Sequence, residues 1–262
     1  MALVAMASAK GSPGVSVTAA TLAGLWSRRC VVADLDPLGS DVLLRFRDEV
    51  GGPLDTERGL LSLAAAVRRG GHSTVDPHLQ RTEHGLEVLA GVTSATQVRG
   101  LGAAWPNIVN ALHTMPGTDV LADCGRLSPG SPALTAVERA DALVMVTRPS
   151  LEQVAHLRER LLGLREPLRM GHLDGIPVGV LTVAEPRDTR SAAEIEQLLR
   201  SSGLSVTSLG TIALDENAAS AVSAGGGRAL RRSLLLRSAR DVADRLGVLL
   251  AQKPRFAEPQ EV

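Results

Sequence analysis

Short runs of apolar residues alternate along the chain with longer segments in which apolar positions recur every three or four residues. The first pattern predicts buried strands and the second predicts amphipathic helices. Strands are expected at residues 2–7, 30–34, 86–90, 119–123, 142–147, 176–183 and 206–214. Helices are expected at residues 16–28, 59–69, 107–115, 152–164, 191–202 and 230–250. Because strands and helices alternate, we predict a three-layer α/β fold with a mostly parallel sheet.

The chain shows no internal repeat and no linker, so we predict a single domain over residues 1–252. Residues 253–262 are rich in proline and charge, which predicts a disordered tail. Segments rich in glycine, proline or charge predict loops at residues 48–58, 71–83 and 128–132.

Composition limits the classes of function. Basic and acidic residues number 28 each, so binding to nucleic acid or anionic lipid would need a local patch. No apolar run approaches the roughly 18 residues of a membrane span. Cys30 and Cys124 lie in apolar runs, which predicts buried free thiols, a reducing compartment and a cytoplasmic protein. The six histidines lack zinc-site spacing, there is no Gly-x-Ser-x-Gly motif, and the few aromatic residues offer no stacking platform for bases.

The stretch AKGSPGVSVT, residues 9–18, lies between the first predicted strand and the first predicted helix. A glycine-rich turn in this place leaves backbone N–H groups free to point at an anion, and the helix N-terminus adds partial positive charge. Ser16 occupies the position from which a phosphate-binding loop supplies a hydroxyl to magnesium. Two strands end in acids, at Asp34 with Asp36 and at Asp123. The alternative is an ordinary α/β turn whose glycines only permit tight packing.

Lysine occurs only at Lys10 and Lys253, whereas every other basic residue is arginine. A lysine in the glycine loop is therefore unexpected from composition. Its compact charge on a flexible stem does a different job from a planar guanidinium.

Residues 10–16, KGSPGVS, resemble the deviant Walker A motif KGGxGK[ST] of the ParA/MinD family of ATPases. Residues 31–40 resemble the D-x-D-P-Q-G-N segment of that family, and residues 120–125 resemble its Walker B strand. Residues 141–150 are similar to a later strand and loop of the family, and residues 210–215 to its G-x-I-P-x-D stretch with Ala213 in place of proline. The resemblance extends over about residues 1–250 and implies a P-loop NTPase-like fold.

The resemblance also implies a homodimer that encloses two ATP molecules with Mg²⁺. Lys10 would then reach the partner's nucleotide, and Asp36 would lie near the attacking water, which makes these two the candidate catalytic residues. Ser16 and Asp123 would bind the metal, Asp123 through water. The candidate nucleotide-binding residues are Lys10, Gly11, Ser12, Pro13, Gly14, Val15, Ser16 and Val17.

The chain departs from the family pattern. Val15 replaces the second lysine of the motif, Leu38 and Ser40 replace Gln and Asn, and no adenine-side asparagine follows the strand at residues 176–183. A hydrogen bond to a charged group is worth roughly 1.5–3 kcal/mol, or about 10- to 150-fold in affinity. Hydrolysis should suffer more than binding, because the lysine offsets charge that grows in the transition state.

Two consequences of Val15 remain open from the sequence. Its side chain could pack inward and close the loop, which would leave no site. Alternatively, Lys10 in cis, or an arginine such as Arg126 or Arg148, could replace the missing charge.

The resemblance implies a bacterial positioning or regulatory protein that helps to place a chromosome or plasmid, the division apparatus, or a pilus or secretion assembly. With the substitutions, we expect a dimer with weak or absent ATPase activity and a protein cargo, recruited from the cytoplasm to the nucleoid, septum or cell pole. One alternative is an active ATP-hydrolysing switch with a substitute cation, and another is a partition protein that binds DNA nonspecifically.

The predicted C-terminal helix carries one apolar stripe. We predict that this stripe covers the sheet rather than a membrane surface, because the acids Asp241 and Asp244 disfavour contact with lipid. Its members are Leu235, Ala239, Val242, Leu246 and Leu249.

Overall fold

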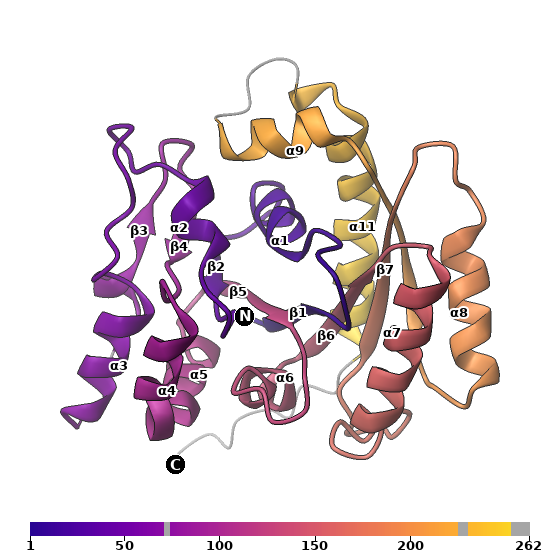
Figure 1. The fold of residues 1–262 in the computed structure, drawn as a ribbon, viewed down its shortest axis with the longest axis horizontal. Coiled ribbons are helices and arrows are strands. Elements are labelled where there is room, and N and C mark those ends of the chain that lie inside the picture. The colour runs from indigo at the N-terminus through magenta and orange to yellow at the C-terminus, as the bar shows by residue number, and fades with distance from the viewer. Residues whose placement is uncertain (71–73, 225–229, 253–262) are drawn as a thin grey trace, which may run out of the picture.

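The computed structural model describes residues 1–70, 74–224 and 230–252. They form one eight-stranded sheet in the order β3-β4-β2-β5-β1-β6-β7-β8 (Figure 1). Every neighbouring pair is parallel except β3 and β4, which are antiparallel. The strands are β1 (Leu3–Ser8), β2 (Cys30–Asp34), β3 (Gln80–Arg81), β4 (Glu87–Leu89), β5 (Asp119–Arg126), β6 (Ala142–Thr147), β7 (Val178–Ala184) and β8 (Thr207–Ala213).

Helices cover both faces of the sheet, which gives the predicted three layers (Figure 1). One core cluster joins the sheet to α3 (Leu60–Arg68), α4 (Ala95–Leu101), α5 (Trp105–His113), α6 (Leu134–Arg139), α7 (Leu151–Leu164) and α8 (Ser191–Ser201). The other joins it to α1 (Val15–Ala23), α2 (Asp41–Arg45), α9 (Glu216–Ser223) and α11 (Leu234–Ala251). Two short 3-10 helices are η1 (Asp76–His78) and η2 (Gly102–Ala104).

The alternation of buried residues along each strand explains the two cores. In β1, Leu3 and Ala5 belong to one cluster, whereas Val4 and Met6 belong to the other. Successive side chains of a strand point to opposite faces, so a strand buried on both sides reads as a continuous apolar run. The apolar runs of the sequence are thus strands buried on both faces, as in a parallel sheet, and the predicted sheet is confirmed.

All seven predicted strands and six predicted helices are present; β2 and β6 have the predicted bounds, and each of the other elements is shifted at one or both ends. The first helix ends at Ala23 rather than residue 28, and the last begins at Leu234, where the Ser233 hydroxyl accepts a hydrogen bond from the Leu236 amide. The predicted loop over residues 71–83 is wrong at its end, because residues 80–81 form β3. Among the described residues, the short α-helices α2, α4, α6 and α9 and the 3-10 helices η1 and η2 were not predicted.

The apolar stripe of α11 is buried, as predicted. Its five members are at most 3% exposed, and the helix packs against β8 and α1. Among the described residues, no helix is both long and apolar enough to span a membrane. The predicted tail at residues 253–262 lies outside the described residues.

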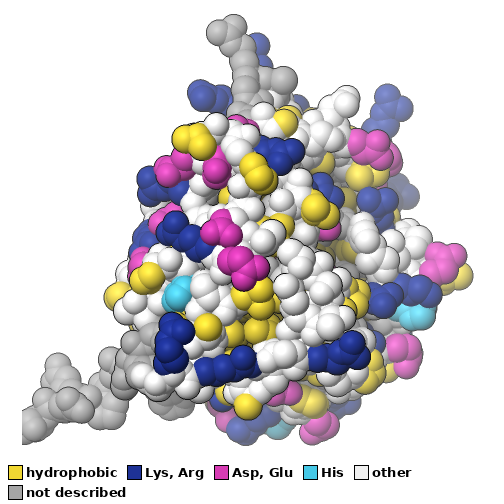
Figure 2. Space-filling model, turned by 60° about the vertical axis from the view of Figure 1, so that its left-hand side comes forward, with side chains coloured by type: hydrophobic (Ala, Val, Ile, Leu, Met, Phe, Trp, Pro, Cys, Tyr) yellow, Lys and Arg dark blue, Asp and Glu magenta, His cyan; other side chains and the backbone are white. Residues whose placement is uncertain are grey.

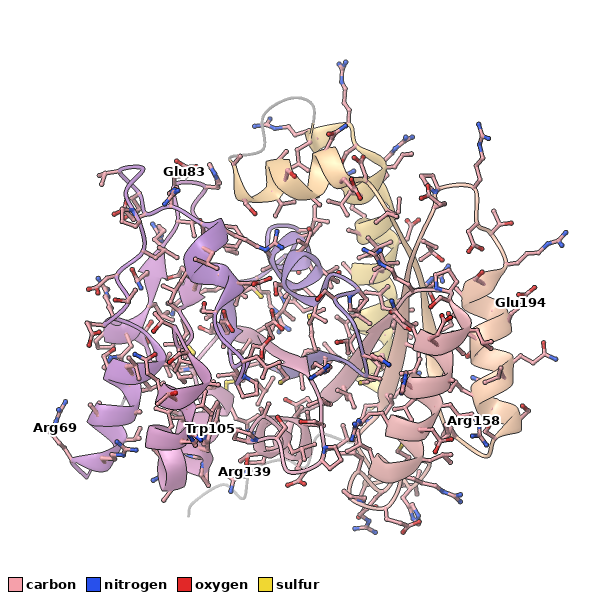
Figure 3. All side chains as sticks on the ribbon, viewed as in Figure 1. Arg69, Glu83, Trp105, Arg139, Arg158 and Glu194 are labelled. Atoms are coloured by element: carbon pink, nitrogen blue, oxygen red, sulfur yellow. The ribbon has the colours of Figure 1, made fainter. Side chains whose placement is uncertain are left out.

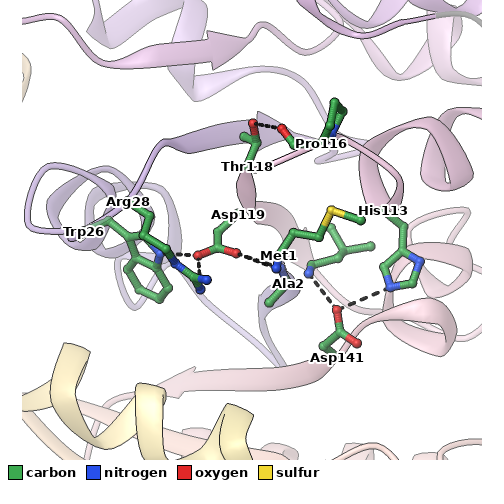
Figure 4. Close-up of polar contacts among 10 residues, drawn as sticks. Met1, Ala2, Trp26, Arg28, His113, Pro116, Thr118, Asp119 and Asp141 are labelled. Carbon is green, nitrogen blue, oxygen red and sulfur yellow. Dashed lines mark hydrogen bonds and ion pairs between the residues drawn. The ribbon is translucent and has the colours of Figure 1, made fainter. Parts of the chain in front are cut away.

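A polar cluster anchors the edge of the sheet where β1 and β5 begin (Figure 4). The Asp119 carboxylate, 1% exposed, accepts hydrogen bonds from the Ala2 amide at 2.7 Å and from Trp26 Nε1 at 2.8 Å. It also pairs with Arg28 Nη2 at 2.6 Å. Asp141 accepts from the Leu3 amide at 2.9 Å. These contacts hold the start of β1, so that its carboxyl end lies at the centre of the opposite edge.

Charged side chains are spread over the surface. Basic and acidic groups are interspersed on the face shown in Figure 2, around a group of hydrophobic side chains. In Figure 3, Arg69, which follows the last residue of α3, and Glu194 on α8 point outward. Arg158 instead links two helices, since its Nε donates to the Ser202 hydroxyl at 2.8 Å. Cys30 and Cys124 are free and buried, as predicted.

Candidate functional site

The glycine loop joins the carboxyl end of β1 to α1, and β1 lies between β5 and β6. Gly11 and Gly14 have φ angles of 71° and 108°, a left-handed backbone that favours glycine. Gly14 caps α1, and its carbonyl accepts the first intrahelical bond from the Thr18 amide at 2.9 Å. The amides at the start of a helix have no acceptor within the helix and can bind an anion. This loop therefore has the backbone of an anion-binding turn.

A cavity of about 310 Å³ opens on one side of the loop. Loop residues 11–17 and Ser8 form one wall. The other wall is formed by Asp36, Leu38, Asp41, Arg45, Gly125 and Arg126. We call this the acidic cavity, because carboxylates from two neighbouring segments meet there.

Asp34 and Asp123 lie beside the acidic cavity, each 1% exposed. The Asp34 carboxylate accepts from the Ser40 hydroxyl at 2.5 Å and from the Asp36 amide at 3.2 Å. Asp123 accepts from the Gly125 amide at 2.9 Å. Burial raises the pKa of both carboxyls, and the nearby Asp123 charge raises the pKa of Asp34 further, whereas a hydrogen bond from Ser16 lowers that of Asp123.

Asp36 lines the acidic cavity, and its position depends on Gly125. An added Cβ on Gly125 would lie 2.1 Å from Asp36 Oδ2, and the glycine has a φ of 58°. The Leu38 amide donates to Asp36 Oδ1 at 2.8 Å. Burial raises the pKa of Asp36, and the charge of Arg126 acts in the opposite direction. The carboxylate thus reaches the cavity only because residue 125 has no side chain.

A second cavity of about 340 Å³ opens on the other side of the loop. We call it the outer cavity; it lies between the loop and the segment from β8 to α9, including Asp215 and Glu216. Arg148 also lines it, and the Arg148 Nε is buried with no hydrogen-bond partner. The two cavities share Ser12, Pro13, Gly14, Val17 and Arg45.

Val15 packs into the core between the sheet and α1, with an exposed fraction of 7%. This is the inward packing that the sequence left open. The loop is nevertheless not closed, because a cavity lies on each side of it. Pro13 also lacks an amide hydrogen, so the loop offers one donor fewer.

Lys10 lies apart from both cavities. Its Nζ is 2.9 Å from Nε2 of His156 on α7, and it is not among the residues that line either cavity. The other predicted loop residues and Asp36 line the acidic cavity, and Asp123 lies next to it. Sequence reasoning missed Asp41 and Arg45, which lie on α2, a helix of five residues that is too short to give a periodic signal.

The described residues contain no group of three or more His, Cys, Asp or Glu side chains that could hold a metal ion. Magnesium does not need such a group, since it keeps several waters and binds through one or two carboxylates plus substrate phosphates. The Ser16 hydroxyl beside Asp123, with Asp36 nearby, fits this kind of partly hydrated site. The assignment of Ser16 and Asp123 to a metal stays a prediction.

No family model and no curated protein sequence matches the chain. Solved structures do match. A ParA family ATPase from Chlorobium tepidum TLS has a TM-score of 0.72 and 18% identity, over 94% of this chain and 98% of that one. The cell division ATPase MinD from Pyrococcus furiosus has a TM-score of 0.70 and 18% identity, over 95% of this chain and 99% of that one.

A third similar structure contains nucleotide. It is the septum site-determining protein MinD from Pyrococcus horikoshii OT3 complexed with Mg-ADP, with a TM-score of 0.69 and 16% identity over 97% of this chain and 99% of that one. Similarity at these identities shows the fold. The chain has the three-layer α/β fold of the ParA and MinD ATPases.

Proposed function

We propose that the chain binds a nucleoside di- or triphosphate with Mg²⁺ at the glycine loop and acts as a ParA/MinD-like positioning protein with little or no ATPase activity. The observation that carries the proposal is the loop itself, a helix N-terminus capped by left-handed Gly14 with an open cavity on each side. Such a loop presents amide donors to a phosphate without any side chain.

The acidic cavity supports the placement of a metal ion. Asp36 and Asp123 belong to neighbouring strand ends, and Ser16 in the first turn of α1 hydrogen-bonds to Asp123. A hydroxyl and hydrated carboxylates next to a phosphate are the usual surroundings of Mg²⁺ in nucleotide sites. The phosphates would therefore lie against the loop, and the nucleoside would extend into the outer cavity.

Weak hydrolysis follows from the charges near the loop. Val15 contributes no cation, and Lys10 contacts His156 outside the cavities of its own chain, so that it would act only on the nucleotide of a partner. Phosphoryl transfer depends on positive charge that meets the charge growing on the transferred group. Without the lysine charge, the transition state loses more stabilisation than the ground state, which backbone amides still bind. We therefore expect nucleotide to bind without efficient turnover.

Dimerisation is supported by apolar side chains at the same edge of the sheet. Leu38 is 60% exposed and lines the acidic cavity, Leu44 on α2 is 80% exposed, and Leu151 at the start of α7 is 84% exposed. Exposed apolar side chains close to a site are typical of an interface. A second copy that covers this edge would bury them, and the dimer would then act as a scaffold for a protein cargo. The solved neighbours include proteins of cell division and plasmid partition.

Titration calorimetry with Mg-ATP and Mg-ADP tests the proposal. We expect heat of binding and a raised melting temperature at millimolar nucleotide, with both effects reduced when Mg²⁺ is withheld. No binding at millimolar concentration would overturn the proposal and leave a turn that only packs.

Steady-state hydrolysis separates the scaffold from the active ATPase. We expect little turnover by the wild type and little change in Lys10→Ala. Magnesium-dependent turnover that is abolished by Lys10→Ala would contradict the scaffold and favour a switch that uses Lys10.

A further inference from the structure

We propose that Arg45 and Arg148 act as a two-sided clamp that helps to bind the phosphates in the ground state, beside a loop in which Val15 offers no charge. The proposal rests on the proposed function, because it names the residues that would hold the phosphates of the same ligand. It concerns two side chains that the glycine-loop motif does not contain.

Arg45 lies where the two cavities meet. It lines both of them, together with Pro13 and Gly14 of the loop. A polyphosphate that follows the loop from the acidic cavity to the outer cavity passes this junction. A guanidinium placed here can donate two N–H groups to phosphate oxygens, a geometry that arginine provides and lysine does not.

Helix α2, which carries Arg45, is anchored to the buried carboxylate of Asp34. Ser40 caps α2, and its hydroxyl donates to Asp34 Oδ2 at 2.5 Å and accepts from the Leu43 amide at 3.1 Å. Phe46, which follows Arg45, is 3% exposed. The backbone of α2 is thus fixed at both ends, and the Arg45 side chain extends from a rigid position.

The present partner of Arg45 is weak. Its Nε lies 3.4 Å from Asp41 Oδ2, and the two side chains are 41% and 56% exposed. An exposed ion pair of this kind contributes little to stability, because water screens both charges. Arg45 can therefore exchange Asp41 for a phosphate at little cost.

Arg148 approaches the outer cavity from the other side, in the segment between β6 and α7. Its amide donates to Gln153 Oε1 at 3.1 Å, which holds its backbone. Its Nε is buried without a hydrogen-bond partner. A buried donor without an acceptor is costly, and because Arg148 itself lines the outer cavity, a shift of its guanidinium towards an anion there would give the Nε an acceptor.

The other candidate cations fit less well. Lys10 lines neither cavity and contacts His156. Arg126 lines only the acidic cavity, where its charge acts on Asp36. Among the described basic residues that line the outer cavity, Arg45 and Arg148 are the two present.

The test measures the dissociation constants of Mg-ADP and of magnesium pyrophosphate by calorimetry for the wild type, Arg45→Gln and Arg148→Gln. We expect each substitution to weaken the binding of both ligands by roughly 10- to 150-fold, the value of a hydrogen bond to a charged group. Arg45→Lys keeps the charge but loses the guanidinium with its two N–H donors, so its affinity should fall between those of the wild type and Arg45→Gln. Arg187→Gln removes an exposed arginine that lines neither cavity and is the matched control.

The outcomes separate the two proposals. Normal binding of both ligands by both glutamine variants, or a loss for Mg-ADP alone, would overturn the clamp while leaving the nucleotide site in place. A wild-type chain that binds neither ligand would overturn the proposed function itself. Thermal unfolding of each variant checks that the fold is retained.

Discussion

Asp34 and Asp123 are register partners on the adjacent parallel strands β2 and β5, and both carboxyls are almost completely buried. They point to the same face of the sheet as Val32 and Leu121, towards α1. Two acids in such a buried environment resist ionisation, because burial and neighbouring negative charge, that of Asp123 on Asp34 and those of Asp36 and Asp41 on Asp123, both penalise the charged forms. Ionising these two carboxyls therefore costs free energy in the folded chain, next to the candidate site.

This cost predicts how stability depends on pH. An unfolded aspartate loses its proton near pH 4, whereas burial raises the pKa of Asp34 to about 8 in the folded chain. Between these values the folded state holds a proton that the unfolded state has lost. The protonated Asp34 carboxyl therefore makes its full contribution to stability below about pH 4, and this contribution is lost as the pH rises towards 8.

Urea unfolding at several pH values between 4 and 8 measures this effect. The wild type should lose stability across the window, and Asp34→Asn, which cannot ionise, should show a flatter profile. Asp34→Asn is also expected to be less stable in absolute terms by about 1–3 kcal/mol, since an amide cannot accept all the present hydrogen bonds. Identical slopes for the two proteins would contradict the prediction.

Gly125→Ala should disturb the acidic cavity. The new Cβ would meet the Asp36 carboxylate and would also require an alanine at a φ of 58°. We expect a loss of about 1–3 kcal/mol in the free energy of unfolding and weaker binding of Mg-nucleotide. The control is Gly130→Ala, at a φ of 74° with no atom within 4 Å of the added Cβ. Equal effects of the two substitutions would show that backbone strain alone is responsible.

Val15→Lys should restore the charge that the loop lacks. A lysine stem can remain in the apolar environment of Val15 while its ammonium group reaches the cavity. We expect Mg-ATP to bind about 10- to 150-fold more tightly and hydrolysis to rise, at a cost of about 1–3 kcal/mol in stability. Val15→Met, which is also long and flexible but uncharged, should give no gain. A folded Val15→Lys protein with unchanged affinity would refute the role assigned to the charge.

Asp119→Ala should reduce stability without changing ligand binding. The substitution removes the acceptor of the Ala2 amide, Trp26 Nε1 and Arg28, so we expect a loss of about 2–4 kcal/mol in the free energy of unfolding. The fluorescence of Trp26 should change with it. Mg-ADP affinity should stay the same, because Asp119 lies at the opposite end of β5 from the cavities.

The comparison for Asp119→Ala is Asp174→Ala, which breaks an exposed ion pair with Arg169. This variant should lose less than about 1 kcal/mol. A similar loss in both variants would mean that Asp119 acts as an ordinary surface charge.

Much of the fold was readable because strand and helix patterns are local. The apolar runs that became β1, β2, β5 and β6 are buried on both faces, and a run of this kind needs no knowledge of its neighbours to be recognised. The sequence identified Asp34 and Asp123 as acids at strand ends, and the structure places them side by side because β2 and β5 are parallel neighbours. The short elements were missed for the opposite reason. α2 and β3 contain too few residues to show a period, and packing against the rest of the chain determines them.

The sequence by itself determined the layered α/β fold, the glycine loop between a buried strand and a helix, and the absence of a cation at position 15. Each of these features depends on residues that are neighbours in the sequence. The tertiary structure alone decided that Val15 turns inward while the loop stays open, that Lys10 contacts His156, and that Arg45 and Arg148 border the outer cavity. These relations join residues from separate segments, and their positions follow from the order of the strands in the sheet, which no local pattern encodes.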